Sequence, residues 1–352
     1  MNQRLLQRLN IRYPIIQAPM AGVSTPALAA AVSDAGGLGS LGLGASTVAQ
    51  AQSLIEQTRQ LTGRPFNVNV FCHTAARRDS EREAQWLARL APVFSRYGGT
   101  PPSQLSEIYQ TFHNHQPMLD MLLEQAPAVV SFHFGVPSTE VIRRFQQQGT
   151  VTMATATCMA EARLIVQAGI DVIVAQGYEA GGHRGIFDPH GDDRQMSTFT
   201  LVQALKRAVE LPIIAAGGIM DGAGIASLMR LGAAGAQLGT AFLLCPEAAT
   251  DSGYRQAITQ NSDSVTHLTA AISGRPARCV KNSWSELVNA SGEQGIPAYP
   301  VAYSAGKALA AAAKAQGDQG FGAHWAGQGV AMIREMPAAQ LVNVLAEEGG
   351  FR

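Results

Sequence analysis

The sequence predicts an α/β fold, a (β/α)8 barrel with an additional, mostly helical cap. Eight short apolar runs alternate with Ala- and Leu-rich amphipathic stretches over about the first 245 residues. The runs are almost continuously apolar, which is typical of parallel strands that are covered on both faces. Most are followed by glycine-rich or polar residues. A doubly wound open sheet shares the alternation, but the count of eight and the polar residues after the strands favour the barrel.

The expected strands lie, in chain order, at residues 14–20, 37–44, 65–71, 128–135, 150–156, 171–177, 211–218 and 235–243. Amphipathic segments such as TPALAAAVSDAGG and CMAEARLIVQAGI separate them, and several end at a glycine, as helices often do.

Two parts of the chain depart from this alternation. Residues 73–127 are too long for a simple connection and contain the charged amphipathic segment RRDSEREAQWLARLAPVF, so we expect a helical insertion outside the barrel. After residue 245 the alternation stops. The expected organisation is therefore a barrel at 1–245, a helical cap at 246–320, and a C-terminal segment at 321–352 that returns to the barrel.

Composition argues against several classes of partner. The 26 basic and 26 acidic residues give no net charge, and no basic run with interleaved aromatics indicates nucleic acid. The sequence has no 18-residue apolar run for a membrane span and no N-terminal pattern of a secretory signal, so we expect a cytoplasmic protein. The cysteines form no CxxC pair, which disfavours zinc and a disulfide framework: Cys72, Cys158, Cys245 and Cys279.

Glycine-rich segments follow the seventh and eighth expected strands. AAGGI places Gly217 and Gly218 there, and QLGTAFL places Gly239 and Thr240. In a barrel these two strand ends commonly bind phosphate through backbone N–H groups. Either glycine-containing segment alone fits a tight turn, but both at adjacent strand ends favour a phosphate-bearing ligand such as FMN. No GxGxxG follows the first strand, so a dinucleotide site is not indicated.

Two amides interrupt apolar runs near strand ends. Asn69 lies in the third strand and Gln176 ends the sixth. A buried amide needs hydrogen-bond partners, which are either a neighbouring strand or the polar edge of a flavin ring. The first strand, IIQAPMAG, would offer a nearly apolar backbone surface to such a ring, with Met20 as a soft contact.

Two of the eight histidines lie at strand ends. His133, in SFHFG, fits a core histidine as well as a site residue. His183, in AGGHRG, lacks the apolar periodicity that would bury it and is the better candidate. We expect the histidines in polar or loop-like stretches to be solvated: His73, His113, His115, His190 and His267. No third ligand falls at metal spacing, so no metal site is expected.

Three polar-tipped residues recur at a spacing of four. On a helix, Tyr299, Tyr303 and Lys307 would share one face. Pro300 suits the first turn of such a helix. The face is either an ordinary amphipathic surface or the lid of a pocket for a small anion.

These motifs together resemble the class I nitronate monooxygenases, formerly called 2-nitropropane dioxygenases. The resemblance is carried by IIQAPMAG, NVNVF, AQGYEAGGHRG, AAGGI and QLGTAFL and covers nearly the whole chain. AGGHRG is fairly specific, whereas IIQAPM and AAGGI occur in similar form in NADH:quinone reductases and FabK-type enoyl reductases.

The resemblance implies an FMN-dependent barrel that oxidises alkyl nitronates, such as toxic propionate 3-nitronate, with O2 to a carbonyl compound and nitrite. It implies His183 as the active-site histidine, with His133, Tyr299, Tyr303 and Lys307 around the substrate. With the first-strand surface and the glycines above, the expected cofactor-binding residues are Ala18, Pro19, Met20, Asn69, Gln176, Gly181, Gly182, Gly217, Gly218, Gln237, Leu238, Gly239 and Thr240.

Some alternatives stay open at this point. A nitronate needs donor or positive groups, which His183 and Lys307 could supply, whereas a neutral nitroalkane would need His183 as a base. The competing functions are an NAD(P)H-dependent flavin reductase of quinones or enoyl thioesters, and a non-enzymatic FMN or phosphate sensor. A monomer or a homodimer is expected.

Overall fold

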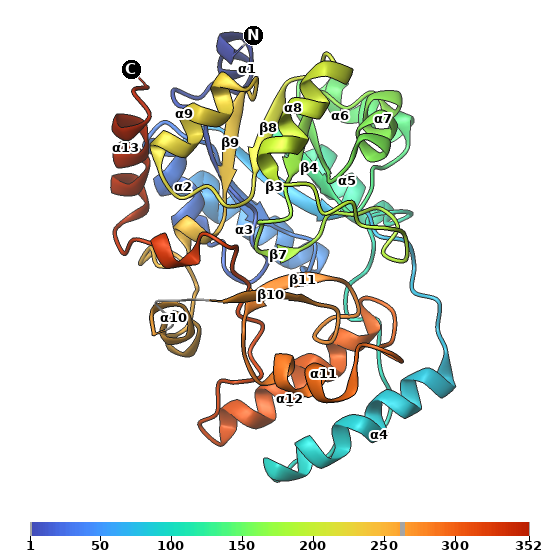
Figure 1. Cartoon of the computed structure of the whole chain (residues 1–352). Helices are drawn as coiled ribbons and strands as arrows, with labels where there is room; N and C mark the ends of the chain where they lie inside the picture. The colour runs from blue at the N-terminus through green and yellow to red at the C-terminus, as the bar shows by residue number, and fades with distance from the viewer. Residues whose placement is uncertain (1, 261–264, 352) are drawn as a thin grey trace.

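A closed eight-stranded parallel barrel is the core of the protein, as the computed structural model of residues 2–260 and 265–351 shows (Figure 1). The strands follow one another in the order β1-β9-β8-β6-β5-β4-β3-β2, and a parallel bridge between Ile16 and Leu38 closes the ring. The predicted barrel is thereby confirmed. Its strands are β1 (Ile15–Gln17), β2 (Gly39–Gly42), β3 (Phe66–Phe71), β4 (Val129–His133), β5 (Val151–Ala156), β6 (Val172–Gln176), β8 (Ile213–Ala216) and β9 (Gly235–Leu238).

Helices cover the outside of this barrel, and polar caps start most of them. Thr25 and Ser197, for example, accept hydrogen bonds from backbone N–H groups in the first turns of α2 and α8. The covering helices are α2 (Pro26–Asp34), α3 (Val48–Leu61), α5 (Gln116–Gln125), α6 (Thr139–Gln147), α7 (Met159–Ala168), α8 (Thr198–Ala208), α9 (Gly222–Arg230) and α13 (Ala338–Glu348). The C-terminal α13 packs against α2 and α9.

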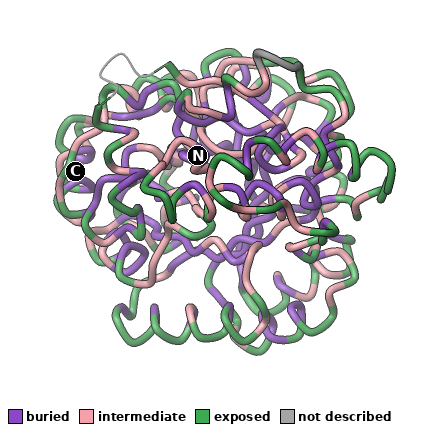
Figure 2. The backbone as a smooth tube through the Cα atoms, turned by 90° about the horizontal axis from the view of Figure 1, so that it is seen from below, coloured by how far each residue is buried: buried purple, intermediate pink, exposed green. Residues whose placement is uncertain are grey.

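The two ends of the barrel differ. At the amino-terminal end, α1 (Asn2–Leu9) inserts Leu5 and Leu9 into an apolar cluster with residues of five barrel strands. The carboxyl ends of the strands face a second, smaller body at the bottom of Figure 1. Buried residues gather in the centre of the molecule and exposed ones on its outer surface (Figure 2). In the part of the chain that the structure describes, α1 thus covers the amino-terminal end of the barrel, and the carboxyl end faces the smaller body.

The smaller body combines helices with a short antiparallel sheet. Its helices are α10 (Ser252–Thr259), α11 (Ser283–Ser291) and α12 (Val301–Ala315). The 3-10 turn η2 (Val330–Met332) contacts α10, whereas η1 (Thr240–Phe242) follows β9 and packs in the barrel core. The sheet consists of β10 (Thr266–Thr269), β11 (Ala277–Val280) and β7 (Gly182–His183). The sequence did not predict β10 and β11. Because β7 belongs to the loop after β6, this sheet ties the body to the barrel.

The long insertion contributes to both bodies. Its helix α4 (Ser80–Arg96) packs against α12, where Trp86, Leu90 and Phe94 join a buried cluster with Leu309 and Ala313. Glu81, Arg82 and Arg96 of α4 are exposed on its other side, which explains its amphipathic pattern. Among the residues that the structure describes, no helix is long and apolar enough to cross a membrane.

The contact of α4 with α12 should depend on Leu309, which has no exposed surface. Leu309→Ala leaves a cavity and is expected to lower the free energy of unfolding by about 3 kcal/mol. Leu61→Ala removes a leucine that is 55% exposed and should cost less than about 0.5 kcal/mol. Urea denaturation of the two variants measures the difference, and equal losses would contradict this packing.

Candidate active site

One cavity of about 1050 Å³ lies between the carboxyl ends of the barrel strands and the smaller body. This volume is at the upper end of the range for ligand pockets. Every site residue predicted from the sequence lines it, although these residues come from segments far apart in the chain. The cavity therefore brings the expected phosphate, ring and substrate groups into one space.

The ends of β8 and β9 form a cradle of unused backbone donors. Gly217 and Gly218 have φ values of +116° and +71°, which favour glycine. Within residues 2–260 and 265–351, no protein group accepts a hydrogen from the N–H of Gly217, Gly218, Gly239 or Thr240. The Thr240 hydroxyl accepts from the N–H of Gly327 at 2.9 Å and keeps its own hydrogen to donate. The arrangement suits a phosphate group.

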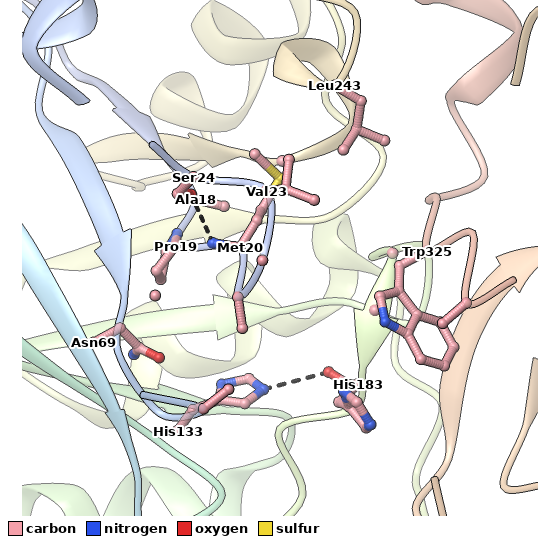
Figure 3. A pocket seen from close by; sticks show the side chains of 18 of the residues that line it. Ala18, Pro19, Met20, Val23, Ser24, Asn69, His133, His183, Leu243 and Trp325 are labelled. Carbon is pink, nitrogen blue, oxygen red and sulfur yellow. Dashed lines mark hydrogen bonds between the residues drawn. The ribbon is translucent and has the colours of Figure 1, made fainter. Parts of the chain in front are cut away.

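The loop after β1 presents a fixed, mostly apolar wall (Figure 3). The N–H of Ala18 donates to the carbonyl of Leu238 at 2.8 Å, which ties the loop to β9. The N–H of Met20 donates to the Ser24 hydroxyl at 2.9 Å. Across the cavity, Asn69 donates its amide N–H to the Ser131 hydroxyl at 2.9 Å and to the Ser131 carbonyl at 3.1 Å. The amide oxygen of Asn69 takes no part in these bonds.

The side chain of Gln176 holds the loop that bears His183. Its Nε2 donates to the carbonyl oxygen of His183 at 3.0 Å. Its Oε1 accepts from the N–H of Gly185 at 2.7 Å and from Nη1 of Arg184 at 3.2 Å. Neither partner considered from the sequence, a neighbouring strand or a flavin edge, accounts for these bonds. One N–H of the amide remains for a ligand.

His133 supports the same loop with both ring nitrogens. Its Nε2 lies 3.3 Å from the carbonyl oxygen of His183, and its Nδ1 lies 2.9 Å from the Thr155 hydroxyl. A carbonyl only accepts, so Nε2 carries the hydrogen and Nδ1 accepts from Thr155. Figure 3 shows the first of these bonds. Burial, and then the charge of Arg275, lowers the pKa of His133 to about 4, so the ring is neutral at pH 7.

His183 itself lies in a cage of aromatic rings. Its ring centre is 5.1 Å from that of Trp325, 5.4 Å from that of Tyr299 and 6.2 Å from that of Tyr303. Its Nε2 lies 2.9 Å from the Ser273 hydroxyl. Although part of the residue faces the cavity, the ring lies deep, and burial followed by the charge of Arg275 lowers its pKa to about 3. It is neutral at physiological pH.

The smaller body supplies two phenol groups and one amine to the cavity. Helix α12 begins at Val301, so the expectation that Tyr299 lies on its first turn is wrong, because Pro300 occupies the N-cap position. Tyr299 nevertheless reaches the cavity with Tyr303. Nζ of Lys307 lies 5.5 Å from the Tyr303 ring centre, and burial lowers its pKa. Burial also raises the pKa values of both tyrosines, which stay protonated hydrogen-bond donors.

Sequence reasoning missed three contributors. Tyr109, from the insertion expected outside the barrel, lines the cavity, and Lys307 Nζ lies 5.0 Å above its ring. Trp325 contacts His183 from the C-terminal segment. Arg275 is only 2% exposed, and its guanidinium lies 4.1 Å from the ring centre of Phe134. Their positions depend on contacts between distant segments, and no local motif marks them.

The expectation that His73 is solvated is wrong. Its exposed fraction is 0%, and its ring packs edge-on against Tyr299 at 5.0 Å between centres. Of the other four histidines expected in solvent, His190 is exposed and the rest are half-buried. Among the described residues, no three His, Cys, Asp or Glu side chains are grouped as a metal would require.

Comparison with known proteins identifies the family. A sequence profile described as "Nitronate monooxygenase" matches residues 2–348. A nitronate monooxygenase of Paraburkholderia phytofirmans is 56% identical over 345 residues, which is 98% of this chain and 94% of that protein. One from Pseudomonas aeruginosa is 48% identical over 99% of both chains. The chain belongs to the nitronate monooxygenase family. The resemblance seen in the sequence is thereby confirmed, and the protein is an oxidoreductase.

Solved structures agree with this family assignment. The structure of nitroalkane oxidase from Streptomyces ansochromogenes is 39% identical and superimposes with a TM-score of 0.89 over 98% of this chain and 97% of that chain. FabK from Thermotoga maritima is more distant, at 29% identity and a TM-score of 0.74 over 99% of this chain and 96% of that chain. The nitronate monooxygenase family thus shares its barrel with FabK, as the weaker motifs had indicated.

The buried His73 predicts a pH-dependent stability. Burial, followed by the charges of Arg275 and His113, lowers its pKa from 6.5 to about 4. Between pH 6.5 and pH 4, His73 is protonated in the unfolded chain but not in the folded one. The free energy of unfolding therefore falls as the pH drops towards 4. Between pH 7 and pH 5 this histidine should cost about 2 kcal/mol.

His73→Phe removes this contribution, and its loss of stability between pH 7 and pH 5 should be smaller than that of the wild type by that amount. Urea denaturation at the two pH values measures it. His190→Gln, which replaces an exposed histidine, serves as the control and should follow the wild type. A His73→Phe variant with the wild-type pH dependence would contradict the assignment.

Proposed function

We propose that the protein is an FMN-dependent enzyme that oxidises alkyl nitronates, such as propionate 3-nitronate, with O2 to a carbonyl compound and nitrite. The observation that carries this proposal is that one cavity contains two separate groups of hydrogen-bond donors. Unused backbone donors at the ends of β8 and β9 lie in the same space as His183, two cap tyrosines and Lys307. The first group suits a phosphate, and the second suits a small anion.

The residues present fit FMN. The N–H groups of Gly217, Gly218, Gly239 and Thr240 would hold the phosphate, and the loop Ala18–Met20 would lie against the ring. Among the described residues, no group donates to the Asn69 amide oxygen and one N–H of Gln176 has no acceptor, so both could bind the polar ring edge. Bound FMN would accept electrons from the nitronate and pass them to oxygen. The family membership supports a flavin at this position.

The other end of the cavity suits an anionic substrate. Tyr299 and Tyr303 are protonated donors, and Lys307 brings a positive charge to the cavity wall. Donors placed in a water-poor site stabilise a negative charge more strongly than they do in water. The reaction replaces the C=N bond of the nitronate by C=O and releases nitrite. Two nitronates and one O2 account for all the atoms and the charge.

The direct test uses the protein purified with its bound cofactor. Its visible spectrum and the cofactor released by heat identify FMN. An oxygen electrode and a nitrite assay with propionate 3-nitronate, without NAD(P)H, should show oxygen uptake and nitrite. Absence of nitrite release with saturating FMN would refute the proposal. Rapid anaerobic bleaching of the flavin by NADH or NADPH, with no nitronate turnover, would instead favour the reductase function.

Replacement of Lys307 should mainly weaken substrate binding. Lys307→Met removes the positive charge from the cavity wall, and a charge-assisted contact typically contributes 1.5–3 kcal/mol, so the KM for propionate 3-nitronate should rise about tenfold or more. Steady-state kinetics measures this rise. The control is Lys281→Met, at an exposed lysine outside the cavity, and should leave KM unchanged. An unchanged KM in Lys307→Met would exclude the assigned contact.

A further inference from the structure

The turn between β10 and β11, residues 270–276, reaches His183 from the smaller body. β11 begins directly after this turn, and its Ala277 pairs with His183 of β7. The register places Ser273, which has no exposed surface, with its hydroxyl 2.9 Å from Nε2 of the His183 ring. A hydroxyl at this distance either donates to the ring nitrogen or accepts from it. The direction decides which nitrogen of His183 carries hydrogen.

A count of hydrogens settles the direction. Ser273 has one hydroxyl hydrogen, and the carbonyl oxygen of Arg275 lies 3.1 Å from the same oxygen. No other donor in the described chain reaches that carbonyl. A buried carbonyl without a donor is costly, so the hydrogen of Ser273 goes to Arg275. The N–H of Arg275 also points at the hydroxyl oxygen, at 3.4 Å. Nε2 of His183 must therefore be the donor.

The other ring nitrogen is then an acceptor. A neutral imidazole with hydrogen on Nε2 has a lone pair on Nδ1. The ring is neutral because it is deeply placed and because Arg275, His133 and His73 surround it, with the uncharged Tyr299 and Tyr303 on its remaining sides. No group of the described residues donates to Nδ1, and His183 lines the cavity. Nδ1 is thus available to a substrate.

We propose that Ser273 is a positioning residue that fixes His183 in the Nε2–H tautomer and so offers the Nδ1 lone pair to the substrate. In this form His183 does not donate a hydrogen bond to an anionic nitronate, and the cap tyrosines and Lys307 are left to bind the anion. A neutral nitroalkane is different. Its α C–H bond breaks, the proton goes to Nδ1, and the electron pair stays on the substrate as the nitronate. The new anion stabilises the imidazolium beside it.

The tautomer can be measured without any activity. In protein labelled with ¹⁵N-histidine, long-range ¹H–¹⁵N spectra distinguish the two neutral forms, and His183→Asn identifies the signals of His183. The wild type should show hydrogen on Nε2 alone, unchanged between pH 6 and pH 8. In Ser273→Ala the second tautomer should appear. Hydrogen on Nδ1 in the wild type, or an unchanged tautomer in Ser273→Ala, would overturn the proposal.

Kinetics provides a second readout, which rests on the proposed function. Ser273→Ala should lower kcat/KM about tenfold for neutral nitroethane and less than about threefold for ethyl nitronate, because only the first substrate needs the acceptor. Ser273→Thr restores a hydroxyl and should recover part of the loss. The control is Ser304→Ala on α12, whose hydroxyl donates to the Val301 carbonyl, and it should not change either value.

The two proposals fail in different ways. Equal losses with both substrates in Ser273→Ala would show a merely structural role for this serine. If the wild type releases no nitrite from any nitronate, the proposed function fails, and the ¹⁵N spectra alone decide the role of Ser273. Thermal unfolding of each variant excludes loss of the fold as the cause.

Discussion

The pairing of β7 with β11 is the constraint on which the site depends. It attaches the glycine-rich segment after β6 to the smaller body. The barrel holds the His183 carbonyl oxygen through Gln176 and His133, at 3.0 Å and 3.3 Å. The smaller body holds the ring of the same residue through Ser273 at 2.9 Å. His183 is therefore fixed from both sides, and barrel and cap cannot separate without losing these bonds.

A buried cation sets the electrostatics around this point. Arg275 donates a hydrogen bond to the Ile186 carbonyl and lies against Phe134, but among the described residues no carboxylate forms an ion pair with it. A buried charge without a close ion-pair partner is expensive, and burial lowers the pKa of Arg275 to about 10, although Glu161 and Asp188 act in the opposite direction. The same charge disfavours protonation of His133 and His183 and favours an anion in the cavity. The charge of Arg275 thus helps to keep both histidines neutral and is consistent with the anionic substrate that we propose.

The sequence predicted what short segments determine. Apolar runs located all eight barrel strands, and the glycines after β8 and β9 located the donor cradle, because both features have a local signature. The burial of His73 and the position of Tyr109 could not be predicted from the sequence. They depend on contacts with Tyr299 and Lys307, which follow much later in the chain. Strands β10 and β11 are short and mainly pair with each other and with a loop, so alternation alone does not reveal them.

The segment AGGHRG illustrates how far a motif can be explained physically. Arg184 is fully buried, pairs with Asp193 at 2.8 Å, and donates to the Gln176 side chain that holds the loop. Gly185 must be glycine, because a Cβ there would lie 2.6 Å from the Thr155 methyl group and 2.9 Å from the ring of His133. The small residue at position 185 thus lets His133 approach and hydrogen-bond the backbone of His183. Both ring nitrogens of His133 form hydrogen bonds to protein groups, whereas Nδ1 of His183 has no partner among the described residues. The two histidines in the cavity therefore have different roles.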